Sequence, residues 1–162
     1  MAKKKEGSKA PILAAIDFSP HSDAVLAWAA EAARRYSAPL LVLHVVHDLA
    51  AAPGYYNSKK GRLRRLEESA SEMMESCLRR FDAKHPKADL SRVAQTMQVI
   101  GLPVNRILEV AEQTGARQIV IGSQGRTGLP HFVLGSKAER VAQLSPIPVT
   151  IVKSKKSLKG ED

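Results

Sequence analysis

Residues 119–141 read IVIGSQGRTGLPHFVLGSKAERV, and this stretch decides the predicted fold. The run 118–121 is short, β-branched and apolar, which is typical of a buried strand. It stops at Gly122, and Gly125 follows three residues later. After nine further residues comes the pair Gly135-Ser136. The order predicted is a strand, a glycine loop, a nine-residue flap and a second glycine at the N-terminus of a helix.

The helix start has the pattern of a capping box, with Ser136 and Glu139 three residues apart. Glycines allow backbone N–H groups to approach an anion. A helix N-terminus adds unpaired N–H groups and the positive end of the helix dipole. A glycine loop and a helix N-terminus that lie close together would bind a chain of phosphates. The alternative is an ordinary strand–loop–helix connection, because glycine motifs also occur by chance.

The spacing Gly-x2-Gly-x9-Gly-Ser after an Ile-Val-Ile-Gly-Ser strand resembles the ATP-binding signature of the universal stress protein family. The match is complete at Gly122, Gly125, Gly135 and Ser136. The similarity extends over most of residues 11–153 and implies the ATP-binding branch of the family.

The composition predicts one globular domain. The chain has 162 residues, of which 44% are hydrophobic, so it can form one core but hardly two. No apolar run has the length of a membrane span, and the basic N-terminus lacks the apolar segment of a signal peptide. The single cysteine, Cys77, excludes an internal disulfide. We therefore expect a cytoplasmic protein without membrane contact.

The net charge of +9 lies largely at the two ends of the chain. Residues 1–9 and 153–162 together carry eight lysines against three acidic residues. We expect a disordered basic arm at 1–10, a nucleotide-binding domain at 11–153 and a basic tail at 154–162. Aromatic residues make up only 4%, too few for a base-stacking platform, so specific nucleic-acid binding is not expected.

Apolar runs predict five strands, at residues 12–16, 40–46, 93–100, 118–121 and 149–152. Helical periodicity predicts helices from Pro20 to Tyr36, with Ser19 as the N-cap, from about Arg62 to Lys84, from Pro103 to Gly115, and from Ser136 to about Leu144. The second helix would bury one stripe of side chains: Leu63, Leu66, Ala70, Met73, Cys77 and Phe81.

Strands that alternate with helices predict an α/β fold with a five-stranded, parallel, doubly wound (Rossmann-like) sheet and helices on both faces. Partial alternation makes residues 93–100 an edge or half-covered strand. In such sheets ligands bind at the carboxyl ends of the strands, at the topological switch point. Asp17 ends the first strand and Gly122 ends the fourth, so we expect both in one crevice.

The resemblance assigns the nucleoside end of this crevice. It implies that Asp17 contacts the nucleoside, that the backbone of Val45 meets the adenine edge, and that Ala15 also contacts the nucleotide. Asp17 has an alternative role as a cap or turn acceptor for the first helix. His44 is expected to be a hydrogen-bonded core histidine.

The phosphate end is expected at the amides of Gly122 and Gly125 and at the amide and hydroxyl of Ser136, with Gly135 as the second glycine of the signature. Ser123 lines the same turn or faces solvent, and Arg126 either reaches a phosphate or is simply exposed. The chain has no P-loop lysine motif, no dinucleotide fingerprint and no metal-ligand cluster. A divalent ion, Mg²⁺ or Mn²⁺, would be held through the phosphates.

The resemblance implies a regulatory module of the stress response that binds ATP and acts through a protein partner that the sequence does not identify. The resemblance also implies a homodimer through the last strand, Val149 to Val152. A slow ATPase or phosphotransferase that uses the same site is the alternative. A third possibility is a protein with this fold and no nucleotide, which the complete glycine signature disfavours.

Overall fold

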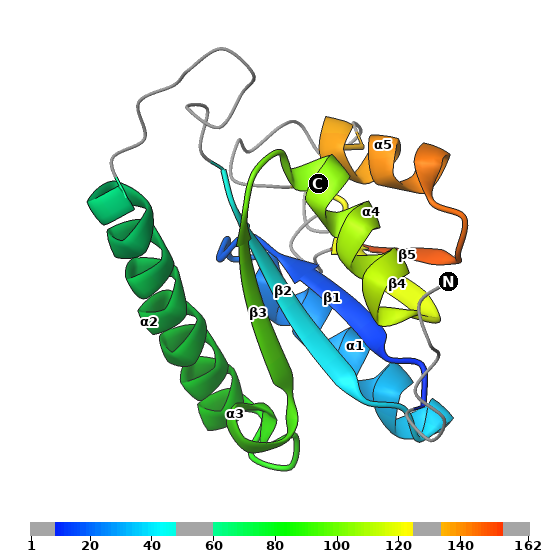
Figure 1. Ribbon diagram of the computed structural model, residues 1–162. Helices are drawn as coiled ribbons and strands as arrows, with labels where there is room; N and C mark the ends of the chain where they lie inside the picture. Colours follow the sequence, from blue (N-terminus) through cyan, green and yellow to red (C-terminus); the bar gives the residue numbers. More distant parts are fainter. Residues whose placement is uncertain (1–8, 48–59, 125–133, 154–162) are drawn as a thin grey trace, which may run out of the picture.

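The computed structural model describes residues 9–47, 60–124 and 134–153 and shows one sheet between two helical layers (Figure 1). The order of elements is β1 (Ile12–Ile16), α1 (Ser22–Tyr36), β2 (Leu40–Val46), α2 (Lys60–Lys84), α3 (Leu90–Val93), β3 (Gln95–Ile100), α4 (Pro103–Thr114), β4 (Gln118–Gly122), α5 (Ser136–Leu144) and β5 (Val149–Val152). The expected basic arm lies outside these residues except for its last two, and the tail lies wholly outside.

The sheet has the strand order β3-β2-β1-β4-β5, and every pairing is parallel. All five residues of β1 are buried because helices cover both faces of this central strand. A strand in that environment carries apolar side chains throughout, which explains the run Ile-Leu-Ala-Ala-Ile. The predicted parallel doubly wound fold is confirmed.

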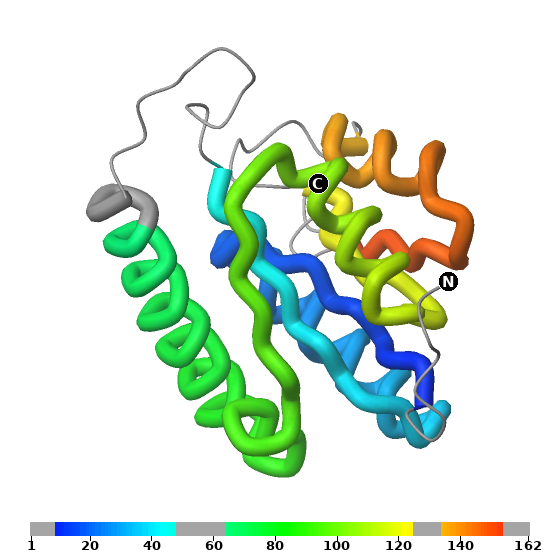
Figure 2. Tube along the Cα trace, viewed as in Figure 1, coloured from blue at the N-terminus to red at the C-terminus, as the bar shows by residue number. Residues whose placement is uncertain are grey.

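Two separate cores fix the helices on the sheet. Figure 2 shows the path of the chain through the sheet and the helices that cover it. On one face, α1, α2 and α3 pack on side chains such as Ile12, Ala14 and Val42. On the other face, α4 and α5 cover their neighbours Leu13 and Leu43. Adjacent residues of one strand thus belong to opposite cores, as the pleat of a strand requires.

The third strand begins two residues later than expected, at Gln95. The predicted strand residue Val93 instead ends the short helix α3 and is 57% exposed. The reason is a tertiary contact. One Asp82 oxygen accepts from the Leu90 N–H at 2.7 Å, and the other accepts from the Ser91 N–H at 2.8 Å. These bonds cap a helical turn that no local sequence pattern predicts. The predicted edge position of β3 is confirmed.

The buried stripe of α2 differs from the prediction at one methionine. Met74 is 1% exposed, whereas the predicted Met73 is 45% exposed. The predicted core positions Ala70, Cys77 and Phe81 are buried, and Leu66 is half-buried. The Leu63 side chain lies outside the described residues. Burial raises the pKa of the Cys77 thiol, as expected for a cysteine that packs as a small apolar residue.

The first helix also begins later than expected. Ser19 heads a turn, because its carbonyl accepts from the Ser22 N–H at 3.0 Å and its hydroxyl accepts from the His21 N–H at 3.3 Å. The helix begins only at Ser22, so Ser19 is not its N-cap and Pro20 is not its first residue.

The end of α4 is as expected: Gly115 adopts φ 61° and stops the helix. Within the described residues no helix combines the length and the apolarity that a membrane crossing needs.

Replacing Asp82 with asparagine should lower the free energy of unfolding by about 1 kcal/mol at pH 7, because a charged acceptor of backbone N–H groups is lost. Burial by itself raises the pKa of Asp82, but the hydrogen bonds from Ser91 and Leu90 outweigh it and hold this pKa below its ordinary value. The contribution is therefore complete above the ordinary aspartate pKa of about 3.9 and disappears as the pH falls below it.

Urea unfolding between pH 7 and pH 3 measures this difference. Asp89→Asn is the control, because Asp89 precedes α3 but makes no capping hydrogen bond from its side chain. A loss that persists unchanged at pH 3, or an equal loss in the control, would contradict the assigned cap.

Candidate functional site

The carboxyl ends of β1 and β4 lie side by side at the centre of the sheet. Ala15 pairs with Ile121, so Asp17 and Gly122 follow at the same edge. From β1 the chain continues to β2 on one side, while β4 lies on the other. This is the topological switch point, where loops leave the sheet in opposite directions and open a crevice.

A cavity of about 590 Å³ opens at this edge. It receives residues from β1, α1, β2, α2, α4, β4 and α5. Seven of the predicted site residues line it: Ala15, Asp17, Val45, Gly122, Ser123, Gly135 and Ser136. The other two, Gly125 and Arg126, lie outside the described residues. The structure thus brings together every predicted site residue that it describes.

A pair of backbone hydrogen bonds joins the loop after β4 to the start of α5. The Ser123 carbonyl accepts from the Gly135 N–H at 2.8 Å, and the Ser123 N–H donates to the Val152 carbonyl at 2.9 Å. A Cβ on Gly135 would lie 3.0 Å from the Ser123 oxygen, so a side chain there would push the loop away from the helix by a few tenths of an ångström. Gly135 thus favours the close approach of two backbone segments.

The predicted capping box at Ser136 does not form. Gly135 occupies the N-cap position with φ −60° and ψ 137°, and Ser136 is the first helical residue. The Glu139 N–H donates to the Gly135 carbonyl at 3.0 Å, so the backbone uses the donor that a serine cap would bind. The hydrogen bond from Gly135 to Ser123 fixes the chain one residue earlier than the sequence pattern suggests.

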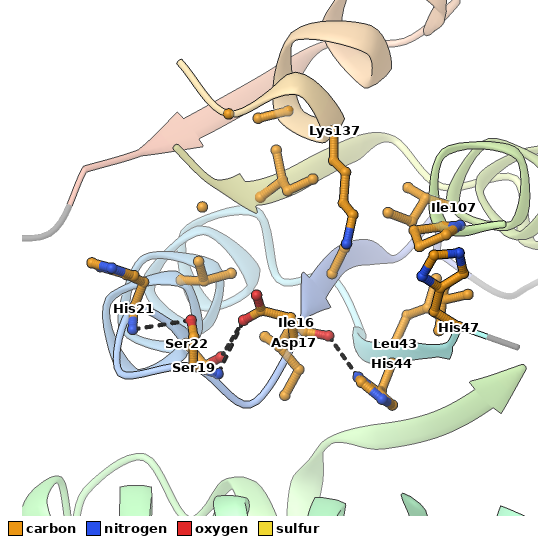
Figure 3. A pocket seen from close by; sticks show the side chains of 18 of the residues that line it. Ile16, Asp17, Ser19, His21, Ser22, Leu43, His44, His47, Ile107 and Lys137 are labelled. Atoms are coloured by element: carbon orange, nitrogen blue, oxygen red, sulfur yellow. Dashed lines mark hydrogen bonds between the residues drawn. The ribbon is translucent and has the colours of Figure 1, made fainter. Parts of the chain in front are cut away.

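Asp17 has the turn-acceptor role that was expected as its alternative. One of its oxygens, Oδ1, accepts from the Ser19 N–H at 3.0 Å and from the Ser22 hydroxyl at 3.4 Å (Figure 3). The same carboxylate lines the cavity. The two roles are compatible, since the turn holds the carboxylate at the cavity wall.

His44 is hydrogen-bonded, as expected, although its ring also lines the cavity. Its Nδ1 lies 2.9 Å from the Ile16 carbonyl, and since a carbonyl only accepts, Nδ1 carries the proton (Figure 3). The Phe18 ring packs on the imidazole with 4.1 Å between centroids. Phe18 adopts φ 60°, an unusual conformation for a residue with a side chain. The strand end beside Asp17 is thus held by packing against β2.

One wall of the cavity is apolar, and Val45 is its only residue that the sequence analysis predicted for the site. The wall combines α2 and the start of α4 with β2, through Leu66, Met73, Pro103, Ile107, Leu43 and Val45. This position explains why Met73 is not in the core, because its side chain faces the cavity. No sequence motif joins these residues, since they come from three separate elements.

Lys137 was also missed. It lies in the first turn of α5 and lines the cavity. In Figure 3 its side chain extends from α5 toward the end of β1, where Asp17 lies. The only available signal was a lysine directly after the glycine signature.

The described part of the lining contains one carboxylate, Asp17, and one permanent cation, Lys137. No three His, Cys, Asp or Glu side chains group into a metal site within residues 9–47, 60–124 and 134–153.

A sequence model of the universal stress protein family matches residues 10–153, which is nearly the whole described domain. This chain belongs to the universal stress protein family. It is 33% identical over 147 residues to the family member YxiE of Bacillus subtilis, and the match covers 88% of this chain and 97% of YxiE. A family member from Mycolicibacterium smegmatis is 31% identical over 146 residues, which cover 90% of this chain. The chain spans only 46% of that longer relative.

The same fold occurs in a solved family member from Archaeoglobus fulgidus in complex with dAMP. It has 26% sequence identity and a TM-score of 0.56, and the match covers 89% of this chain and 98% of that one. That protein binds an adenine nucleotide on the same sheet architecture.

Gly135→Ala should destabilise the protein by about 1–3 kcal/mol, because its Cβ would press on the Ser123 carbonyl. Ser136→Ala should change stability by less than about 0.5 kcal/mol, because Ser136 is not the cap. Urea unfolding of both variants tests the assignment. A larger loss of stability in Ser136→Ala than in Gly135→Ala would support the capping box at Ser136 and contradict the close contact at Gly135.

Proposed function

We propose that this chain binds ATP in the cavity at the ends of β1 and β4 and acts as a nucleotide-dependent regulatory module. The observation that carries the proposal is the two-ended cavity. One end has an apolar wall, and the other has the Gly122 loop beside the start of α5. The volume of about 590 Å³ is in the usual range for small-molecule sites.

Each part of ATP has a matching part of the lining. The wall of Leu43, Met73 and Ile107 suits the base, which buries its faces against apolar side chains. The Asp17 carboxylate can accept hydrogen bonds from ribose hydroxyls. The backbone at Gly122 and at the start of α5 offers N–H groups to phosphates. Gly125 and Arg126 remain proposed phosphate contacts from the sequence.

The bound dAMP of the Archaeoglobus relative supports a nucleotide ligand. ATP itself rests on the glycine signature and on the two-ended cavity. Mg²⁺ or Mn²⁺ would be held mainly by phosphate oxygens, since Asp17 is the only carboxylate in the described lining.

A regulatory role fits the lining better than rapid catalysis. Asp17 Oδ1 already accepts two hydrogen bonds that hold the turn, which suits a binding residue better than a mobile general base. We propose that the module acts in the cytoplasm through a protein partner. Slow ATP hydrolysis in the same cavity remains the second candidate, and its turnover can be followed in the binding samples.

We also propose a homodimer through β5. This strand is at the end of the sheet, and its carbonyls at Pro148 and Val152 accept from β4. Because backbone groups alternate in direction along a strand, those of Val149 and Ile151 point away from β4. A short apolar edge with open donors and acceptors suits pairing with a second copy.

Gly122→Val should weaken ATP binding by about 100-fold or more, equivalent to about 2.7 kcal/mol, because the new side chain would press on the Gln124 carbonyl and on Val25 at the cavity wall and distort the loop that holds the phosphates. Calorimetry with nucleotide-free protein measures the affinity. Gly115→Ala is the control, since Gly115 has φ 61° outside the cavity, so this variant should lose stability but keep its affinity. Unchanged ATP binding in Gly122→Val would exclude the proposed cradle.

Ile151→Pro should convert the dimer to a monomer, because proline removes the N–H that points to the open edge and spares the bonds to β4. Ile151→Ala keeps that N–H and should remain dimeric. Light scattering after size-exclusion chromatography gives the masses. Monomeric wild-type protein, or a dimer in both variants, would exclude this interface.

A further inference from the structure

We propose that Lys137 makes the affinity of the cavity depend on the number of ligand phosphates, so that ATP is selected over AMP. This inference rests on the proposed nucleotide binding and deepens it. The shared glycine signature ends at Ser136, so it assigns no role to the next side chain.

The position of Lys137 directs its charge to the ligand. It is the second residue of α5, and side chains of a helix lean toward the helix N-terminus. The ammonium group of Lys137 therefore lies beyond the N-terminal end of α5, near the N–H groups of its first turn, which have no partner within the helix. Figure 3 shows the side chain extending over the cavity toward the Asp17 end. A ligand bound between Gly122 and Asp17 would lie within reach of this cation.

The charge of Lys137 is unfavourable for its own helix, and Asp17 is the only carboxylate of the described lining that can offset it. A helix N-terminus is the positive end of the helix dipole, and cations there are normally disfavoured. Among the ion pairs of the described residues, none involves Lys137. A residue that breaks a local rule without a protein partner in the described chain is expected at a functional position.

The cavity also needs this charge to accept a polyanion. In the described lining, Lys137 offsets the only carboxylate, Asp17. Without Lys137 that lining would carry a net negative charge and would repel each added phosphate. The backbone N–H groups would remain, but they are neutral donors and discriminate weakly between one phosphate and three.

The test compares ATP, ADP, AMP and adenosine by calorimetry in wild-type protein and in Lys137→Met, which keeps the length of the side chain and removes its charge. ATP affinity should fall about 10- to 100-fold, the range for loss of a charge-assisted contact. The affinity for AMP should fall less and the affinity for adenosine should hardly change, so the preference for ATP over AMP becomes smaller. Lys137→Arg keeps the positive charge and should therefore keep most of this preference.

Lys87→Met is the matched control, because it removes the same charge from an exposed residue between α2 and α3, outside the cavity lining. Thermal unfolding of each variant checks that the fold is retained. Inorganic tripolyphosphate serves as a second probe, since it carries the anionic part without a nucleoside.

The outcomes separate the two proposals. If Lys137→Met binds ATP and AMP in the wild-type ratio, the role of Lys137 is refuted while nucleotide binding stands. If wild-type protein binds no nucleotide, the proposed function fails, and the binding of tripolyphosphate then tests the role of Lys137 by itself. Tripolyphosphate binding that weakens in Lys137→Met but not in Lys87→Met supports the anion-binding lysine. Equal binding in both variants, or none to wild-type protein, overturns it.

Discussion

The backbone of Ser123 joins the three parts of the molecule that form the phosphate end of the cavity. Its N–H binds the Val152 carbonyl of β5, and its carbonyl binds the Gly135 N–H at the start of α5. These two bonds hold β5, the loop after β4 and the N-terminus of α5 in one arrangement. A Cβ at Gly135 would lie 3.0 Å from the Ser123 oxygen, so the absence of a side chain at this residue allows the loop and the helix to lie this close together. The direction of α5, and with it the position of Lys137, depends on this contact.

The turn that follows β1, beside the cavity, stores some backbone strain. Phe18 adopts φ 60°, which costs on the order of 1–3 kcal/mol for a residue that carries a side chain. Its ring packs on His44, which in turn binds the Ile16 carbonyl. This packing on β2 offsets the strain and keeps the chain turned sharply after β1. The sharp turn leaves Asp17 at the cavity wall and the start of α1 beside Gly122.

The sheet was predictable because a strand buried on both faces must be apolar at every position, as in Ile12–Ile16 and in the first four residues of β2. Two errors have one cause, which is that a contact distant in the chain outweighed a local pattern. The bonds to Asp82 hold a helical turn before Gln95, and the bond between Gly135 and Ser123 fixes the start of α5. The choice of Met73 over Met74 was a different error, because both residues fit helical spacing from Ala70. The glycines and Asp17 could be found because the family signature and the strand ends mark them. The apolar wall could not, because its residues are adjacent only after α2 and α4 have packed on the sheet.

The central pairing of β1 with β4 has a consequence for the order of folding. Ile12 pairs with Gln118, so the middle of the sheet closes only after most of the chain is available. Contacts between such distant segments carry a large loop-closure entropy and form late. During synthesis the N-terminal segment must therefore wait for β4, although it can already pair with β2. A ligand that bridges Asp17 and Gly122 would bind only the completed sheet and would stabilise it by mass action. Protection of the β1 amides from hydrogen exchange would then report ligand occupancy throughout the central sheet.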